Sequence, residues 1–398
     1  MYIETLCTEQ SSVADAISEL KQKLAGKAEP SLLMLYINEQ HEHSNLQHLI
    51  KQQFSTTKFI GCTSCQGVMS HTGVYNNQAV GMMALGDEQG VFGVGFCEYI
   101  SGDDKSASIA GKQALTAALS DSGRAGELPA FILLHASPPN EEAILQAITE
   151  LVGNSVPVIG GSAADDKVNG NWCVFSSAGQ ARSAVSIAVC YPSCDVALSF
   201  YSGYEPNQHS GVVTKVSGRD IITIDNKPAA QVYSTWTNGL DGAIAPDTNI
   251  FTDSTLLPLA RQIDSGTGYP FYILSHPERV TAESGLRLFS QVQEGETVYL
   301  MHGSKESLIT RAGRVTQSAL NSCDYQGQKI YGSLIIYCAG CRLCLHDEMP
   351  QVVTSLNNYM NGSQFLGVYS FGEQGQLPNQ ANAHANLMIS ALLFLERC

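Results

Sequence analysis

The stretch Leu32-Leu-Met-Leu-Tyr-Ile37, written LLMLYI, recurs 99 residues later as Phe131-Ile-Leu-Leu-His-Ala136, written FILLHA. Each copy is a short run of apolar residues, which is typical of a strand buried on both faces of a sheet. A second pair keeps the same offset, because Phe59-Ile-Gly-Cys-Thr-Ser64 matches Val158-Ile-Gly-Gly-Ser-Ala163. The sequence therefore predicts a repeated unit built on these strands.

Helical spacing fills the interval between the two strands of the second copy. Apolar residues recur there on one face of a helix, namely Ile144, Leu145, Ile148, Leu151 and Val152. Two further apolar stretches follow each copy, at residues 79–85 and 91–96 and at residues 184–190 and 196–201. The predicted unit is a strand, a helix, a second strand and a glycine turn, with two more strands after it.

A third and looser copy lies near the C-terminus. Residues 334–337 predict its first strand, residues 350–359 its helix and residues 365–368 its second strand. The last segment, residues 381–396, is apolar nearly all round, which predicts a buried helix whose first turn faces a site.

The chain changes character near residue 205. Residues 211–224, GVVTKVSGRDIITI, predict two strands around Ser217-Gly218. At 398 residues the chain also exceeds the roughly 250 to 300 residues at which single cores stop growing. We therefore expect an α/β fold with repeated strand-helix-strand units and mixed β-sheets, in two domains of residues 1–205 and 206–398.

Composition and charge limit the classes of partner. The net charge of −15 leaves no basic excess for a phosphate backbone, so we expect no nucleic-acid partner. The first residues, MYIETLCTEQ, lack the pattern of a secretion signal, and no apolar run reaches the roughly 18 residues that cross a membrane. These features predict a cytoplasmic protein without a membrane partner, and they leave open whether it forms a homo-oligomer.

Three cysteines and a histidine follow the first strand of the third copy, in SLIIYCAGCRLCLH at residues 333–346. The segment contains Cys338, Cys341, Cys344 and His346, and thiolates at such spacing hold zinc or belong to an iron–sulfur run. A second Cys-x-x-Cys, Cys62 and Cys65, lies at the glycine turn of the first copy. In a reducing compartment, twelve cysteines favour metal or redox chemistry over disulfides. A bound metal, a redox-active thiol pair and ordinary packing all stay open.

The turn at residues 158–166, VIGGSAADD, is a second candidate site. Gly160, Gly161 and Ser162 would present backbone N–H groups to an anion, and Asp165 or Asp166 would accept from an amino group. The alternative is a tight strand exit whose aspartates cap neighbouring amides. Glu373, which stands next to a glycine in a similar turn, allows the same two interpretations.

These stretches resemble the FIST family, a two-part bacterial sensory module with an N-terminal and a C-terminal FIST domain. The resemblance rests on residues 59–64 and 157–166, on Cys338-Ala-Gly340 followed by Arg342, on residues 367–373, and on His384 with Asn386. It implies that the two expected domains are the two FIST domains. It also implies that they bind a small ligand, with Arg342, Glu373 and Asn386 as further candidate contacts.

Three details are similar to a subgroup of FIST proteins described as nitric-oxide-sensing haemoproteins. They are Cys338-Ala-Gly-Cys341, Gly372-Glu-Gln-Gly375 and His384-Ala-Asn-Leu-Met388. The subgroup implies a haem cofactor and a partner sensor histidine kinase that controls biofilm formation through a two-component system. A haem usually needs an axial histidine, for which we name His384 first, and then His302 and His346.

The expected function is that of an intracellular sensor, in which nitric oxide binds the haem and shifts a two-state switch that the kinase reads. An enzyme is not expected, because the sequence has no nucleophile elbow, phosphate loop or His-Glu-x-x-His motif. Two alternatives remain. One is a haem-free FIST module for a small metabolite such as an amino acid, and the other is a cysteine-based zinc or redox regulator.

Overall fold

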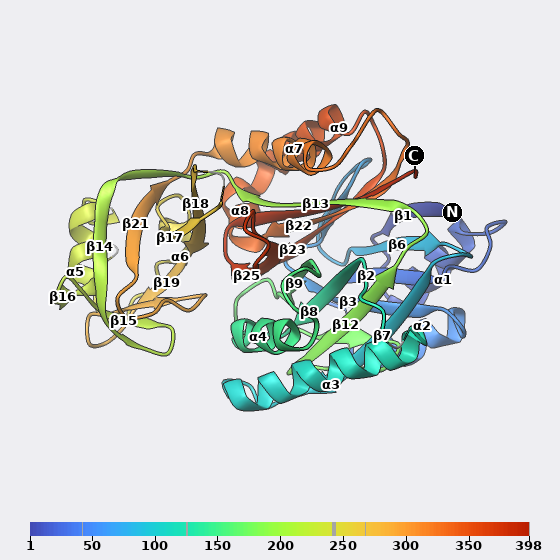
Figure 1. Ribbon diagram of the computed structural model, residues 1–398, viewed down its shortest axis with the longest axis horizontal. Coiled ribbons are helices and arrows are strands. Elements are labelled where there is room, and N and C mark those ends of the chain that lie inside the picture. The colour runs from blue at the N-terminus through green and yellow to red at the C-terminus, as the bar shows by residue number, and fades with distance from the viewer. Residues whose placement is uncertain (42, 125, 241–243, 267, 398) are drawn as a thin grey trace.

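The computed structural model describes residues 1–41, 43–124, 126–240, 244–266 and 268–397 (Figure 1). Three α/β units form a body, drawn on the right of Figure 1, and a lobe built mainly of strands extends from it on the left. The three units share one order of elements.

The first unit contains the first copy of the repeat. Its central strand β2 (Leu32–Asn38) pairs in parallel with β3 (Lys58–Ser64) and antiparallel with β6 (Val80–Gly86). The other elements are β1 (Tyr2–Thr8), α1 (Val13–Lys23), α2 (Leu46–Gln53), β4 (Val68–Ser70) and β5 (Gly73–Tyr75). Both faces of β2 are buried, which explains why its sequence is apolar without alternation.

The second unit repeats this plan. Its central strand β8 (Phe131–Ala136) pairs in parallel with β9 (Val158–Ser162) and antiparallel with β12 (Ala184–Tyr191). The other elements are β7 (Val91–Glu98), α3 (Asp104–Ser122), α4 (Glu141–Val152), β10 (Val174–Ser176) and β11 (Gly179–Ala181).

The third unit is interrupted by the lobe after its first strand. Strand β22 (Ile330–Cys338) pairs in parallel with β23 (Phe365–Ser370) and antiparallel with β26 (Met388–Leu395). The other elements are β13 (Asp195–Ser202), α7 (Lys305–Asn321), α8 (Ala339–Leu345), the 3-10 helix η2 (His346–Glu348), α9 (Met349–Tyr359), β24 (Glu373–Gln376) and β25 (Asn382–Ala385).

The lobe is inserted between β13 and α7. Its strands form one antiparallel array, in the order β18-β17-β21-β14-β15-β20-β19, with β16 beside β15. The elements are β14 (Glu205–Ser217), β15 (Asp220–Ile224), β16 (Lys227–Pro228), α5 (Ala229–Trp236), α6 (Phe251–Ser254), β17 (Leu259–Asp264), β18 (Pro270–Ser275), β19 (Pro277–Val280), β20 (Leu286–Leu288) and β21 (Thr297–His302).

Each unit of the body lends a hairpin to the sheet of another unit. β4 of the first unit pairs with β23 of the third, β10 of the second pairs with β3 of the first, and β24 of the third pairs with β9 of the second. Every six-stranded sheet of the body is therefore made from two units. This exchange ties the N-terminal and C-terminal parts of the chain into one body.

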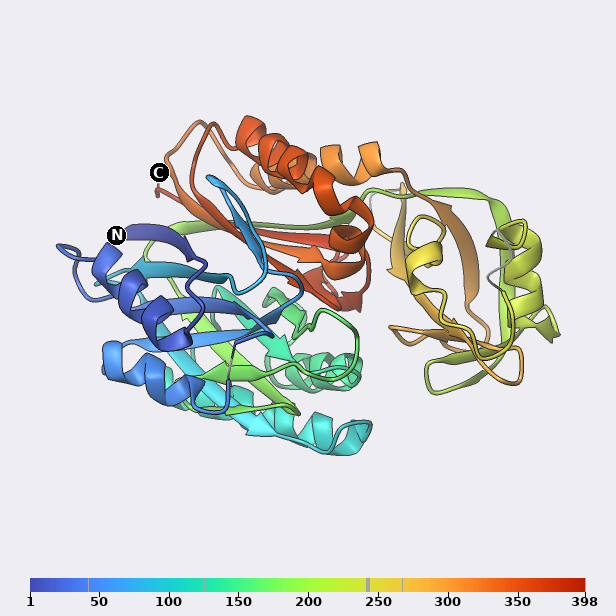
Figure 2. The same ribbon diagram turned by 180° about the vertical axis from the view of Figure 1, so that it is seen from behind.

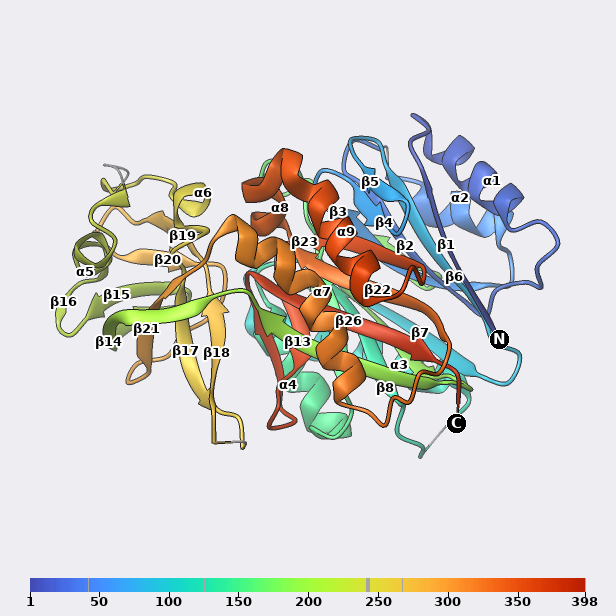
Figure 3. The same cartoon turned by 90° about the horizontal axis from the view of Figure 1, so that it is seen from above.

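The sheets meet at their inner faces and carry helices on their outer faces. Met34 of β2, Leu133 of β8 and Leu334 of β22 belong to one apolar core. Helices α1 and α2 cover the first sheet, α3 and α4 the second, and α7 and α9 the third (Figures 2 and 3). Among the described residues, no helix is both long and apolar enough to cross a bilayer.

The structure confirms the α/β class, the mixed sheets and the three repeat copies. The predicted strands are β2, β3, β8, β9, β22 and β23, and the predicted helices are α4 and α9. The two strands expected around Ser217-Gly218 are β14 and β15. The chain leaves the body at β14, near the boundary expected at residue 205, and returns to it at α7.

The buried helix predicted for residues 381–396 is wrong, because the segment forms strands β25 and β26. β26 lies between β13 and β22, and every one of its residues is buried. A strand enclosed on both faces is apolar all round, so its composition cannot be distinguished from that of a buried helix.

Candidate functional site

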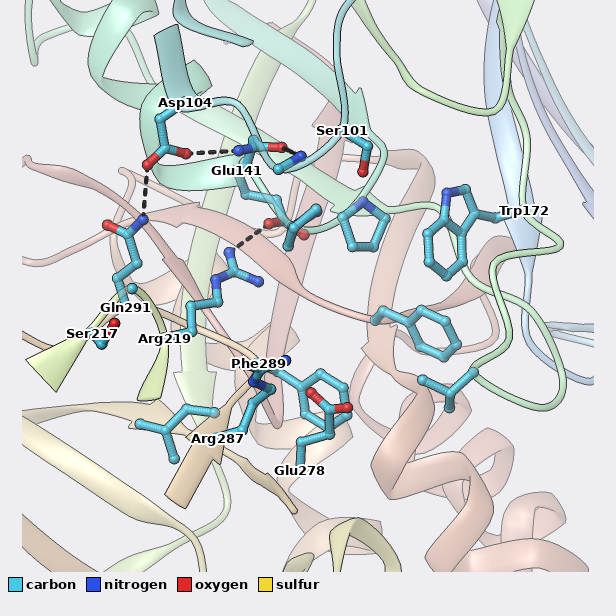
Figure 4. Close-up of a pocket in the computed structure, with 18 residues that line it drawn as sticks. Ser101, Asp104, Glu141, Trp172, Ser217, Arg219, Glu278, Arg287, Phe289 and Gln291 are labelled. Atoms are coloured by element: carbon cyan, nitrogen blue, oxygen red, sulfur yellow. Dashed lines mark hydrogen bonds and ion pairs between the residues drawn. The ribbon is translucent and has the colours of Figure 1, made fainter. Parts of the chain in front are cut away.

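A cleft of about 480 Å³ lies between the body and the lobe (Figure 4). The body contributes the loop before α3, the start of α4, Trp172 and Phe371. The lobe contributes the turn between β14 and β15 and several residues between Glu278 and Gln291. The volume lies within the range of about 300 to 1,000 Å³ that is usual for small-molecule sites.

Arg219 joins the two sides of the cleft. It stands in the turn between β14 and β15, and its Nη2 donates to Oε2 of Glu141 at 2.7 Å and to Oε2 of Glu142 at 2.5 Å. Burial alone would lower the pKa of Arg219, but the two carboxylates raise it, so the guanidinium stays charged. For Glu142 the directions are reversed: burial would raise the pKa, whereas His384 and Arg219 lower it. We call Arg219, Glu141 and Glu142 the interlobe latch.

Gln291 adds two more bonds between lobe and body. Its backbone N–H donates to Oε1 of Glu142 at 2.7 Å, and its side chain donates to Asp104 at 3.4 Å. Asp104 also accepts from Nδ2 of Asn140, the residue that precedes α4, at 2.7 Å. The start of α4 is therefore held from both sides, which fixes the position of Glu141 and Glu142.

Aromatic side chains and further charges line the rest of the cleft. Trp172 and Phe371 pack edge to face with ring centroids 6.0 Å apart. Phe289 lines the cleft from the lobe (Figure 4). Burial raises the pKa of Glu278, and this effect outweighs the nearby arginines, of which Arg287 is the strongest. The cleft thus combines apolar surface with groups of both signs.

His384 lies in β25, beside the latch. Its ring is buried, with Nδ1 3.1 Å from Nε2 of Gln374, and Nε2 has no hydrogen-bond partner among the described residues. In the part of the chain that the structure describes, one group of three histidine, cysteine or acidic side chains could hold a metal ion. It consists of His384, Glu141 and Glu142, whose ligand atoms lie within 4.8 Å of one another.

The three stretches that resemble the haemoprotein subgroup meet at Glu373. Its carboxyl group accepts from Oγ of Ser370 at 3.0 Å and from the backbone N–H of Met388 at 3.1 Å, and Cys338 lies beside it. Burial raises the pKa of Glu373 well above its usual range, and Cys338 acts in the same direction. Burial thus favours the protonated form of the Glu373 carboxyl group. Asn386 is also buried, and accepts from the backbone N–H of His276 at 3.2 Å.

The cysteine loop forms the short helix α8. Cys338 and Cys341 are buried and interact with each other, whereas Cys344 is half-buried. His346 is exposed, and its Nδ1 pairs with Asp347 at 2.7 Å. Burial raises the pKa of both Cys338 and Cys344, which keeps these groups as thiols. The four side chains of the predicted metal loop do not converge on one point.

The other predicted cysteines also lie in the core. The Cys62 sulfur is 3.6 Å from Nδ1 of His135, and burial raises the pKa of Cys62. Cys65 packs in a different cluster, which it shares with Cys338, and burial raises its pKa too. Arg342 is buried nearby, where its Nη2 donates to Asn76 at 2.8 Å.

At the predicted glycine turn, two strands lie in close contact, and the backbone amide of Ser162 is already hydrogen-bonded within the protein. A Cβ at Gly160 would lie 1.8 Å from the carbonyl oxygen of Leu134, and the N–H of Ser162 donates to the carbonyl of Gly372 at 2.8 Å. The aspartates bind backbone amides: Asp165 accepts from Lys167, Asn169 and Asn171, and Asp166 accepts from Gln66 and the side chain of Asn38.

None of the three histidines predicted as haem ligands lies in the cleft. His302 and His346 are exposed, and neither of them nor His384 is on the lining of the cleft. The free Nε2 of His384 lies beside carboxylates rather than in an apolar slot. A haem needs both an axial ligand and an apolar slot, so the lining of this cleft does not form a haem pocket.

Sequence reasoning missed the residues that build the cleft. Glu141 and Glu142 follow a proline pair and open a helix, where acidic residues are ordinary because of the helix dipole. Arg219 stands in a hairpin turn, where a charged residue is also ordinary. Only the packing of the lobe against the body brings these residues together.

Comparison with known families finds that the model of the FIST N domain matches residues 31–227 and the model of the FIST C domain matches residues 229–376. No curated protein matches the sequence. Two solved structures of cyanuric acid hydrolases each align with 100% of this chain and 99% of their own at 8% identity. One, described under "evolutionary innovation by structural concatenation", has a TM-score of 0.38, and the other, from A. caulinodans, has 0.39. A likeness at this level gives no information on activity.

Proposed function

Because the chain belongs to the FIST family, whose domains are sensor domains of signal transduction, we propose that it reports the presence of a small ligand bound between its body and its lobe. The observation that supports this function is the cleft, which has the volume of a small-molecule site and is bridged by the interlobe latch. A ligand that contacts both sides would bind with different affinity when the latch holds the lobe to the body and when the latch is open. Such a difference is what a two-state sensor requires.

The lining favours a ligand that carries both charges, such as an amino acid. Arginine binds carboxylates with paired hydrogen bonds, and Arg219 and Arg287 are both on the lobe side. Glu278 is the partner that we assign to an ammonium group, because its half-buried carboxyl would be stabilised as the anion by a cation beside it. The aromatic rings of Trp172 and Phe289 suit an apolar side chain.

Binding of amino acids to the full chain, measured by calorimetry, tests this function. We expect Glu278→Gln to weaken the binding at least tenfold, whereas Glu283→Gln, at an exposed position in the same lobe, should leave it unchanged. Failure of all twenty amino acids to bind the wild-type protein would contradict the proposed ligand class. Equal binding by the Glu278→Gln variant would contradict the assigned contact.

The receiving protein that we propose is a sensor histidine kinase in a two-component system. This partner is implied by the resemblance of the three stretches that meet at Glu373. The autophosphorylation rate of such a kinase, measured with and without the sensor and with and without its ligand, tests the proposal. A rate that is the same in all four mixtures would contradict it.

A haem-based nitric oxide sensor that acts in biofilm signalling is the second candidate function. Contact between the three subgroup-like stretches supports it, and His384 lies in one of them. The test is the absorption spectrum of protein from haem-supplemented cells, reduced without oxygen, before and after nitric oxide is added. A stoichiometric band that shifts would establish this function over the first. Folded protein without a haem band, even after reconstitution, would eliminate it.

A further inference from the structure

We propose that Glu141, Glu142 and His384 bind a divalent transition-metal ion, and that this ion competes with Arg219 for the two carboxylates. The inference goes beyond the proposed function and does not depend on the ligand of the cleft. It also gives Nε2 of His384, which has no partner among the described residues, a binding partner that suits the neighbouring carboxylates.

The three ligand atoms are already close. One oxygen from each carboxylate and one ring nitrogen of His384 lie within 4.8 Å of one another. An ion bound at about 2.1 Å from each atom would hold them about 3.0 to 3.5 Å apart. Each pair of ligand atoms therefore has to approach by no more than about 2 Å to close the site.

Each ligand is held by a neutral group on its other atom. Ser162 donates to Oε1 of Glu141 at 2.7 Å, and the N–H of Gln291 donates to Oε1 of Glu142 at 2.7 Å. Both Oε2 atoms are thereby left facing the same point, where Arg219 now lies. Outer contacts of this kind orient the ligands in metal sites.

Gln374 does the same for His384. Its Nε2 lies 3.1 Å from Nδ1 of the ring, while its own Oε1 is buried without a partner. The two ends of an amide are assigned from the surrounding hydrogen bonds. Nε2 of Gln374 also lies 3.2 Å from Oγ of Ser162. With the amide reversed, Oε1 accepts from Nδ1–H and takes the hydroxyl proton that Ser162 now donates to Glu141, the ion replaces that donor at Glu141, and Nε2 of His384 keeps a lone pair for a metal. That buried Nε2 is the unpartnered atom that points to a ligand independently of the acidic pair.

Arg219 occupies the position of a cation. A single atom, Nη2, bridges the two carboxylates, and Figure 4 shows its contact with Glu141. Nε of the same guanidinium is buried without a partner among the described residues. The residue stands in a two-residue turn, so it can leave without unfolding a strand. Metal binding and the latch therefore exclude each other, and a bound ion would leave Gln291 as the remaining contact between the lobe and Glu142 of α4.

The donor set identifies the class of metal. One imidazole and two carboxylates suit divalent zinc, iron, manganese and cobalt, whereas the cysteines elsewhere prefer soft ions. Cobalt is the best probe, because its spectrum separates the two kinds of site. Nitrogen and oxygen ligands give weak visible bands, and thiolates add a strong near-ultraviolet band.

Titration of the full chain with Co²⁺, followed by absorption, tests the site. We expect one ion per chain without the thiolate band. His384→Gln and Glu142→Gln should each weaken binding at least tenfold, whereas Arg219→Met should strengthen it at least tenfold. His346→Gln and Arg279→Met are matched controls, one exposed histidine and one arginine of the same lobe, and should bind like the wild type.

Three results would overturn the proposal. They are a thiolate band in the wild-type protein, wild-type binding by both Glu142→Gln and His384→Gln, or no gain in affinity in Arg219→Met. If circular dichroism shows that one of the two weakened variants is unfolded, the other carries the test. The rise in melting temperature with Mn²⁺ then serves as a second readout, and we expect it to be largest in Arg219→Met.

Discussion

Tyr36 and His135 occupy the same position in the first and second copies of the repeat, and they are hydrogen-bonded to each other in the core. Oη of Tyr36 lies 3.0 Å from Nε2 of His135, whose Nδ1 donates to the carbonyl of Gly161 at 2.9 Å. Nε2 is therefore the acceptor and Tyr36 the donor. Burial lowers the pKa of His135 to about 4, so the ring is neutral at pH 7. Equivalent strands of the units thus face one another across the centre of the body.

The interlobe latch should contribute to stability as a unit. In Arg219→Met, two carboxylates that are buried or half-buried lose their cation, and breaking such a pair costs about 3 to 5 kcal/mol. We expect the free energy of unfolding in urea to fall by an amount near the lower end of that range. Arg287→Met, which removes an arginine whose side chain is 49% exposed, should cost less than about 1 kcal/mol. Equal losses in the two variants would contradict the role of the latch.

Glu373 should affect stability in a direction opposite to that of most carboxylates. Its pKa is raised in the folded protein, so folding takes up a proton, and stability is lost as the pH rises above the unfolded value of about 4.3. Glu373→Gln removes this dependence. We therefore expect the stability of the variant relative to the wild type to increase from pH 5 to pH 8. A constant difference across that range would show that Glu373 is ionised in the folded protein.

His276 should make the protein sensitive to acid. Burial lowers its pKa to about 4, and its Nε2 donates to the carbonyl of Phe251 at 2.8 Å. The unfolded chain therefore binds one more proton between about pH 6.5 and pH 4, so stability falls as the pH falls through that window. The full effect is about 3 kcal/mol. Chemical unfolding of the wild type and of His276→Gln at several pH values should show the difference shrinking by that order towards pH 4.

The repeat was predictable because its strands are enclosed on both faces. Strands β2 and β8 carry apolar runs that no exposed element would carry, and their offset survives in the sequence. The exchange of hairpins was not predictable. Strands β4, β10 and β24 have only three or four residues, and nothing local indicates which sheet they join.

The candidate site was harder to predict than the fold, because it depends on contacts between distant residues and not on a local pattern. Glu373 and Cys338 stand out in the sequence, yet they are enclosed in the core. The cleft depends instead on Glu141 and Arg219, which are 78 residues apart and belong to unremarkable local patterns. Their relationship exists only after the lobe has packed on the body.

Trp172 should report directly on the cleft. The chain has two tryptophans, and Trp236 lies in α5 of the lobe, stacked on His209 with ring centroids 6.1 Å apart. In Trp236→Phe the remaining fluorescence comes from Trp172, which lines the cleft beside Phe371. We expect a ligand of the cleft to shift the emission of this variant, and the concentration at half-maximal shift to equal the dissociation constant from calorimetry. The reverse variant, Trp172→Phe, should bind more weakly and show little shift. A shift carried by Trp236 instead would place the ligand in the lobe and not between lobe and body.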